Sequence, residues 1–172
     1  MKRNVIYFFV LLLRFFSPCL LFGEGSGTLY VAHIIAVIDG DTVRIRFCGT
    51  CPDSCKNIET VRLIGVDTPE LYTKIPEFYS HEARDFTDRY WRDPVFIELD
   101  PVTGLRDKYH RLLAYVWVSP KAGCCGDMLN RLLILYGYGC YYNKFQFKNS
   151  RMRYFRKAQM HAKKLHLGIW QS

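Results

Sequence analysis

Three acidic side chains and two arginines, placed in three short segments, are the residues of this 172-residue chain best suited to chemistry. They are Asp41, Asp67 and Glu70, together with Arg62 and Arg111. Carboxylates can hold a hard cation and activate water, and the planar guanidinium group of arginine binds phosphate oxygens in pairs. Hydrolysis of a phosphodiester requires this combination, and the sequence therefore predicts a site for that reaction.

Each of these residues also has an ordinary structural interpretation. Asp41 could form a local turn, Glu70 could stand near the start of a helix, and Arg111 could be a charge at a hairpin end. Arg62 is harder to explain in this way, because a half-buried guanidinium in an apolar strand needs an anionic partner. Asp39-Gly40 is a tight-turn signal, and we interpret it as lying outside the site.

Length and composition indicate one globular domain with a polyanionic partner. A chain of this length can form a single sizeable core, and contents of 49% hydrophobic and 23% charged residues argue against disorder. The net charge of +8 and the pI near 9.2 favour a polyanion, although the same basicity could serve only solubility.

Residues 1–23 have the features of a secretory signal peptide. Lys2 and Arg3 form a positive start, and an apolar run follows from Val5 to Leu13. Arg14 interrupts the apolar stretch, so that neither half reaches the ~20 residues that span a bilayer. We expect an extracytoplasmic protein, secreted or periplasmic. If the leader is not cleaved, it would act as a membrane anchor.

Six cysteines follow the leader, and an even number in an exported chain favours disulfide bonds. They are Cys48, Cys51, Cys55, Cys124, Cys125 and Cys140. The alternative is a zinc site, because Cys48, Cys51 and Cys55 bring three thiols close together in the sequence. No fourth ligand stands at a familiar spacing.

The apolar patterns predict five short strands and three helices. The strands are expected at 29–37, 42–47, 60–66, 95–99 and 112–118. In the second strand apolar residues alternate with arginines, as in a half-buried hairpin. The helices are expected from Ser80, as the N-cap, to before Asp93, and over 127–136 and 150–165. This order is typical of an α+β fold built on a closed or partly open OB-type barrel of five strands.

The last two expected helices each carry one apolar stripe. The inward residues are expected to be Leu129, Leu132, Leu133 and Tyr136 in one helix, and Phe155, Ala158, Ala162 and Leu165 in the other. Basic residues cover the remaining faces of the last helix, and we interpret them as a solvated surface.

Four motifs in this order resemble the staphylococcal nuclease (thermonuclease) family, secreted calcium-dependent nucleases with an OB-fold. The resemblance runs from about Thr28 to Trp170 and defines an expected domain over residues 28–170. The motifs are Ile38-Asp39-Gly40-Asp41-Thr42, Arg62-Leu63-Ile64-Gly65-Val66-Asp67-Thr68-Pro69-Glu70, Asp107-Lys108-Tyr109-His110-Arg111 and Leu167-Gly168-Ile169-Trp170.

The resemblance implies a Ca²⁺ site and a catalytic carboxylate. Asp41 and Asp67 would be carboxylate ligands of one Ca²⁺, and the backbone carbonyl of Thr68 and water would complete the shell. Glu70 matches the residue described as the general base that positions or deprotonates the attacking water. Ca²⁺ accepts six to eight oxygen ligands, including carbonyls and water, which agrees with this donor set.

The resemblance also implies a phosphate clamp and a nucleotide contact. Arg62 and Arg111 align with two arginines that hold the scissile phosphate, where fixed positive charge stabilises the charge that grows in the transition state. Lys108 and Tyr109 match positions that contact a terminal phosphate and base. Tyr115 and Trp170, in contrast, are expected to be packing residues.

Two features of this sequence depart from the family pattern. Where the family often presents two tyrosines to the nucleotide, this chain has Asn143 and Phe145, although Tyr141 and Tyr142 lie close by. His110 stands in place of a glycine in a turn, and histidine adopts positive φ less readily. Stacking tolerates such changes, so nucleotide binding is expected to persist with altered affinity.

The cysteines are a further departure. Asp41 opens the second expected strand and Arg111 precedes the fifth, so the far ends of both strands should meet at the opposite end of the barrel. We therefore predict that at least one disulfide joins the segment of Cys48, Cys51 and Cys55 to Cys124 or Cys125, away from the chemistry.

These observations lead to one functional expectation and two alternatives. We expect an exported, monomeric, Ca²⁺-dependent nuclease that cleaves single- or double-stranded DNA and RNA and prefers single strands or unpaired ends. By the resemblance, it leaves 3′-phosphate ends. The first alternative is an OB-type module that binds nucleic acid without cutting it. The second is a membrane-tethered surface protein that binds another protein.

Overall fold

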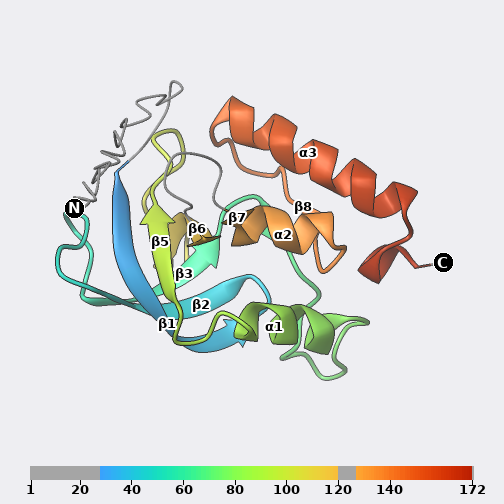
Figure 1. Cartoon of the computed structure of the whole chain (residues 1–172), viewed down its shortest axis with the longest axis horizontal. Helices are drawn as coiled ribbons and strands as arrows, with labels where there is room; N and C mark the ends of the chain where they lie inside the picture. The colour runs from blue at the N-terminus through green and yellow to red at the C-terminus, as the bar shows by residue number, and fades with distance from the viewer. Residues whose placement is uncertain (1–27, 120–126, 172) are drawn as a thin grey trace, which may run out of the picture.

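The computed structural model describes residues 28–119 and 127–171 as a β-barrel flanked by helices (Figure 1). Its strands are β1 (Leu29–Asp39), β2 (Thr42–Phe47), β3 (Ile58–Leu63), β4 (Val66–Asp67), β5 (Pro94–Glu98), β6 (Leu112–Ser119), β7 (Asp127–Met128) and β8 (Cys140–Tyr141). Its helices are α1 (Ser80–Asp88), α2 (Leu129–Leu135) and α3 (Asn149–Lys164), followed by a 3₁₀ turn at Gly168–Trp170.

Five of these strands close into a barrel. β1 pairs antiparallel with both β2 and β5, and its two register irregularities against β2 allow this long strand to bend between its partners. β2 pairs with β3, and β5 pairs with β6. A parallel pairing of β3 with β6 closes the ring. The prediction of an α+β fold with a five-stranded OB-type barrel and three helices is confirmed.

The hairpin of β1 and β2 shows why the sequence forms a barrel wall. Val43, Ile45 and Phe47 are buried, whereas Arg44 and Arg46 are exposed. Successive side chains of a strand point to opposite faces, so this alternation turns one face toward the core and the other toward solvent. The predicted half-buried hairpin is confirmed.

The prediction of one strand over 60–66 is wrong at its end. β3 ends at Leu63, and the chain turns at Ile64 and Gly65 before β4. Gly65 has a φ of +74°, and a Cβ atom there would lie 2.7 Å from ring atoms of Phe147 and Phe155. Only glycine fits this turn, which redirects β4 away from the barrel to pair with β8.

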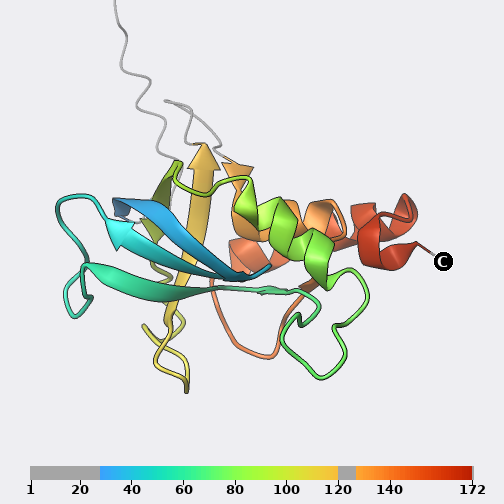
Figure 2. The same cartoon turned by 90° about the horizontal axis from the view of Figure 1, so that it is seen from below.

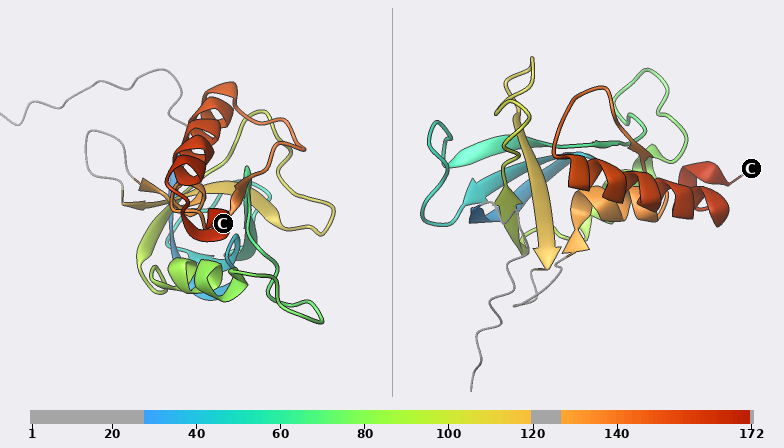
Figure 3. Two further views of the ribbon diagram at one scale, coloured as in Figure 1. Left: turned by 90° about the vertical axis from the view of Figure 1, so that its right-hand side faces the viewer. Right: turned by 90° about the horizontal axis from the view of Figure 1, so that it is seen from above.

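The helices gather at one end of the barrel, where α2 packs on α3 and α1 lies against β1 (Figure 1, Figure 3). Their predicted apolar stripes are buried, with two exceptions. Tyr136 and Leu165 are 49% and 52% exposed, because each follows the last residue of its helix and no longer belongs to the stripe. α2 also begins two residues later than expected, because Asp127–Met128 pairs with β6.

The predicted N-cap of α1 is wrong. Tyr79 occupies the cap position with a left-handed φ of 71°, and Ser80 is the first helical residue. The Ser80 hydroxyl is buried and has no hydrogen-bond partner.

Asp100 ties the barrel to the start of α3. It accepts hydrogen bonds from the Tyr115 hydroxyl at 2.6 Å and from the Lys148 backbone N–H at 3.0 Å. Burial alone would raise the pKa of Asp100, but these donors hold it below its usual range. Tyr115 is fully buried, which confirms its expected packing role.

The cysteine predictions are largely untested by the described residues. Cys48, Cys51, Cys55 and Cys140 carry no disulfide bond, while Cys124 and Cys125 lie outside the described residues, so the predicted long-range disulfide stays a prediction. The thiols of Cys48, Cys51 and Cys55 do not form a metal-binding group. The leader also lies outside the described residues, among which no helix is long and apolar enough to span a bilayer.

Candidate active site

Arg62 is held between two carboxylates, one from the turn between β1 and β2 and one from β4. It stands on β3 opposite Thr42, the first residue of β2. Its guanidinium lies 2.8 Å from Asp41 Oδ2 and 2.8 Å from Asp67 Oδ1, and also donates to the Val66 carbonyl at 2.8 Å. The anionic partner that the sequence required for Arg62 is therefore a pair of acids.

Asp41 is the buried member of this pair. It is 5% exposed and accepts hydrogen bonds from the Thr68 backbone N–H at 2.9 Å and from the Thr42 hydroxyl at 3.0 Å. Burial raises the pKa of the Asp41 carboxyl, while the Arg62 guanidinium opposes that shift. Thr68 reaches Asp41 because Gly40 has no side chain: a Cβ at Gly40 would lie 2.8 Å from Thr68 Oγ1.

The donor atoms at this point fit a hard cation. Thr68 follows Asp67 in the chain and donates its backbone N–H to the Asp41 carboxylate, and its own hydroxyl is buried without a hydrogen-bond partner. Ca²⁺ binds such oxygen ligands and accepts carbonyls and water in its shell. Within the described residues no three His, Cys, Asp or Glu side chains form a metal-binding group, so carbonyl and water ligands would have to complete the set.

Glu70 faces a carboxyl group that sequence reasoning left outside the site. Burial raises the pKa of Glu70, and the carboxylate of Asp39 raises it further, whereas Arg62 lowers it. Burial also raises the pKa of Asp39, which is 8% exposed. Asp39 is the last residue of β1 and Asp41 lies in the turn that follows, so no strand alternation in the sequence indicated this neighbour.

The loop before β6 brings the second arginine. Asp107 accepts hydrogen bonds from the backbone N–H groups of Tyr109 and Arg111, and Arg111 Nε donates to Asp107 Oδ2 at 2.7 Å. Arg111 Nη1 lies 3.4 Å from the Thr42 hydroxyl, next to Asp41. His110 adopts a φ of 61°, the left-handed conformation that a glycine would adopt without strain.

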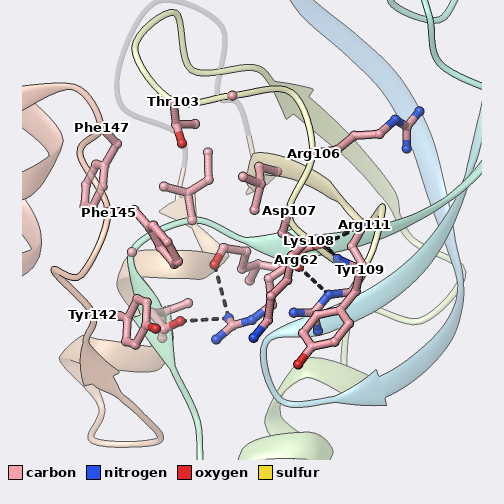
Figure 4. Close-up of a pocket in the computed structure, with 16 residues that line it drawn as sticks. Arg62, Thr103, Arg106, Asp107, Lys108, Tyr109, Arg111, Tyr142, Phe145 and Phe147 are labelled. Atoms are coloured by element: carbon pink, nitrogen blue, oxygen red, sulfur yellow. Dashed lines mark hydrogen bonds and ion pairs between the residues drawn. The ribbon is translucent and has the colours of Figure 1, made fainter.

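A pocket of about 660 Å³ opens beside these arginines (Figure 4). Both arginines line it, and so do Lys108 and Tyr109. The opposite wall carries Tyr142, Phe145 and Phe147, whereas Asn143 is not among the lining residues. Sequence reasoning named Tyr142 only as a nearby substitute, and the structure places its ring in the wall.

The structure thus brings the predicted residues together in two connected groups. Asp41, Arg62, Asp67 and Thr68 are joined by direct hydrogen bonds and ion pairs. Arg111 reaches this group through Thr42, and Glu70 lies within electrostatic range of Arg62. The predicted substrate residues Lys108 and Tyr109 lie in the adjoining pocket. The chemical roles of all these residues stay predictions.

A closed OB-type barrel with carboxylates and arginines beside an aromatic pocket defines the class of this protein. A family model described as staphylococcal nuclease homologue matches residues 60–172. The thermonuclease of Staphylococcus intermedius is 37% identical over 139 residues, which cover 78% of this chain and 73% of that protein. The thermonuclease of Staphylococcus hyicus is 33% identical over 145 residues, with 81% and 75% covered. The chain belongs to the staphylococcal nuclease family.

A further relative is an endonuclease that is less similar to this chain. The SPbeta prophage-derived endonuclease YokF of Bacillus subtilis strain 168 is 29% identical over 137 residues, which cover 77% of this chain and 41% of that protein. The similarity is thus shared with a protein much longer than the matched region.

Proposed function

We propose that this protein is an exported nuclease that hydrolyses phosphodiester bonds of DNA and RNA with Ca²⁺ as cofactor. The observation that supports this best is the pairing of one guanidinium, that of Arg62, with both Asp41 and Asp67 at the edge of a pocket lined by further cations. The names of its relatives, two thermonucleases and one endonuclease, point to the same reaction.

The proposed cation would be held by Asp41, Asp67 and the Thr68 carbonyl. When bound there, Ca²⁺ would polarise a phosphate oxygen and lower the pKa of a water molecule. Asp41 and Asp67 keep Arg62 directed at the same point, so the guanidinium does not have to be ordered when substrate arrives.

The two arginines act on the phosphate. Arg62 and Arg111 both line the pocket, and Asp107 fixes the direction of Arg111 through its Nε–H. Negative charge grows on the phosphate oxygens as water attacks, and arginines oriented in advance stabilise that charge more than they stabilise the ground state.

Glu70 positions the attacking water and accepts its proton. A raised pKa suits this role, because a base is more effective when its pKa lies closer to the working pH. Lys108 and Tyr109 hold the next phosphate and base of the chain inside the pocket. The products carry 3′-phosphate ends, and the protein acts as a monomer.

The test is cleavage of single-stranded DNA by the purified protein with Ca²⁺ and then with EGTA. Glu70→Gln should lower kcat at least about 100-fold, which is the lower end of the range expected when a general base is lost. Glu82→Gln is the matched control, because Glu82 is exposed on α1. Tight DNA binding without cleavage by the unaltered protein would favour the non-catalytic binding module instead.

A further inference from the structure

A column of aromatic rings runs from the core to the surface next to Glu70. Phe86, which is 5% exposed, stacks on Tyr138 with ring centroids 4.5 Å apart. Tyr138 stacks on Tyr79 at 5.6 Å, and Tyr79 contacts Phe78 at 5.5 Å. Phe78 ends the column and is 68% exposed. A large apolar ring is therefore presented to solvent and supported from behind.

The loop that carries Phe78 is fastened to the proposed catalytic residue. The Glu77 backbone N–H donates to the Glu70 carbonyl at 3.0 Å, and the Glu70 N–H donates to Glu77 Oε2 at 3.0 Å. The left-handed φ of Tyr79, 71°, turns the chain between Phe78 and α1. These bonds hold the backbone next to Phe78 beside Glu70.

Phe78 lies outside the pocket but on the same side of the barrel. No residue between 67 and 79 lines the pocket. The loop between β4 and α1 nevertheless projects in the same direction as the loop before β6 and the loop between β8 and α3 (Figure 2, Figure 3). A polynucleotide cleaved at Glu70 has nucleotides on both sides of the scissile bond. In the proposed reaction the pocket would accept one side, and the loop that carries Phe78, which is bonded to Glu70, offers a surface to the other side.

We propose that Phe78 is a stacking platform for a base of single-stranded nucleic acid, on the side of the scissile phosphate away from the pocket. A base placed on Phe78 would continue the existing column, and every base offers a π-face for this contact. Lys74, exposed in the same loop, adds a positive charge for the backbone. The proposal rests on the proposed nuclease function and makes an unpaired strand of several nucleotides the preferred substrate, because a duplex keeps its bases stacked on each other.

The first experiment compares cleavage of a thymidine dinucleotide with cleavage of oligothymidines extended at one end or the other. Extension at one end should raise kcat/KM of the unaltered protein. Phe78→Ala should lower that gain about tenfold, as expected for loss of a stacked base. Tyr154→Ala is the matched control, because it removes an exposed ring on α3, which carries no site residue, and should keep the full gain. An equal gain in Phe78→Ala would overturn the proposal.

Two more variants separate stacking from general apolar contact. Phe78→Trp keeps an aromatic face and should retain the gain, whereas Phe78→Leu keeps apolar area but loses the ring and should behave like Phe78→Ala. If Phe78→Leu equals the unaltered protein, stacking is refuted. Loss of binding to phosphatidylcholine vesicles in Phe78→Ala, with unchanged oligonucleotide cleavage, would assign the ring to a membrane surface and also overturn the proposal.

A binding experiment keeps this test independent of catalysis. In the Glu70→Gln background with EGTA, a fluorescein-labelled decathymidine should bind about tenfold more weakly when Phe78 is replaced by alanine. In the same background, Phe78→Trp should show tryptophan fluorescence quenching on addition of unlabelled decathymidine, beyond any quenching seen with Phe78 intact. These readouts stand even if the protein cleaves nothing, and failure of both would refute the platform while leaving the nuclease proposal in place.

Discussion

Replacement of Arg106 by methionine tests how the arginine-bearing loop is held in place. Arg106 makes two bonds to Glu59, at 2.7 and 3.0 Å, and also donates to the carbonyls of His110 and Ser54 at 3.1 and 3.0 Å. One side chain therefore joins β3, the cysteine segment and the loop that carries Arg111. The substitution removes all four bonds and leaves the apolar stem.

The loss of stability expected for Arg106→Met follows from the burial of its partner, Glu59. The Glu59 side chain is 7% exposed, and without Arg106 it would keep only the bond from the Lys56 backbone N–H. Breaking a buried ion pair costs about 3–5 kcal/mol, and because Arg106 is itself 26% exposed we expect about 3 kcal/mol. For a chain of this size that corresponds to a fall in Tm of about 6–12 °C.

The stability lost in Arg106→Met should decrease as the pH falls. The hydrogen bonds from Arg106 hold the pKa of Glu59 below its usual range. A carboxyl group with a lowered folded pKa contributes stability above its unfolded pKa, and that contribution disappears as the pH falls through the folded value. The difference in Tm between the unaltered protein and Arg106→Met should therefore have its full size at pH 7. It should become smaller as the pH falls below the usual glutamate pKa of 4.5.

The assay is thermal unfolding followed by circular dichroism at pH 7 and at pH 4. Arg46→Met is the matched control, because it removes the same charge from an exposed position on β2. Equal Tm losses in the two variants, or a difference for Arg106→Met that stays constant between the two pH values, would refute the reasoning.

Two glycine-related substitutions test backbone conformation. His110→Gly should raise Tm by about 1–3 °C. The free energy gained by relieving the strain at a left-handed φ exceeds the free energy lost because glycine makes the unfolded chain more flexible. An unchanged or lower Tm in calorimetry would contradict this. Gly137→Ala should lower the free energy of unfolding by about 3 kcal/mol or more, because its Cβ would overlap the Leu167 carbonyl oxygen. Urea denaturation measures this against Gly104→Ala, whose Cβ would meet nothing closer than 3.8 Å, and coincident midpoints would refute it.

Local patterns in the sequence predicted the barrel correctly and singled out the main acids and arginines, whose chemical roles stay predictions. The alternation in β2 predicted which face is buried, and the apolar context of Arg62 predicted that it must have an anionic partner. These features depend on neighbours within a few residues, so they are visible without knowledge of the fold. The end of β3 was missed because the turn at Gly65 is enforced by Phe147 and Phe155, which are distant in sequence.

The parts of the site that sequence reasoning missed depend on contacts between distant segments. Asp39 was explained well enough by its Asp-Gly turn, and only the return of the chain at Glu70 buries it beside a second carboxyl. The bond between Glu59 and Arg106 joins residues 47 positions apart. Neither contact has a local sequence pattern.

The charge balance of the site gives a physical reason to expect a cation there. The carboxyl groups of Asp39, Asp41, Asp67 and Glu70 influence one another electrostatically, and Arg62 forms ion pairs with two of them, Asp41 and Asp67. Arg111 is engaged with Asp107, which is a fifth acid, and so does not compensate the cluster. Neighbouring carboxylates repel one another unless one of them is protonated or another positive charge is supplied. In the proposed nuclease, a divalent cation among oxygen ligands would supply that positive charge.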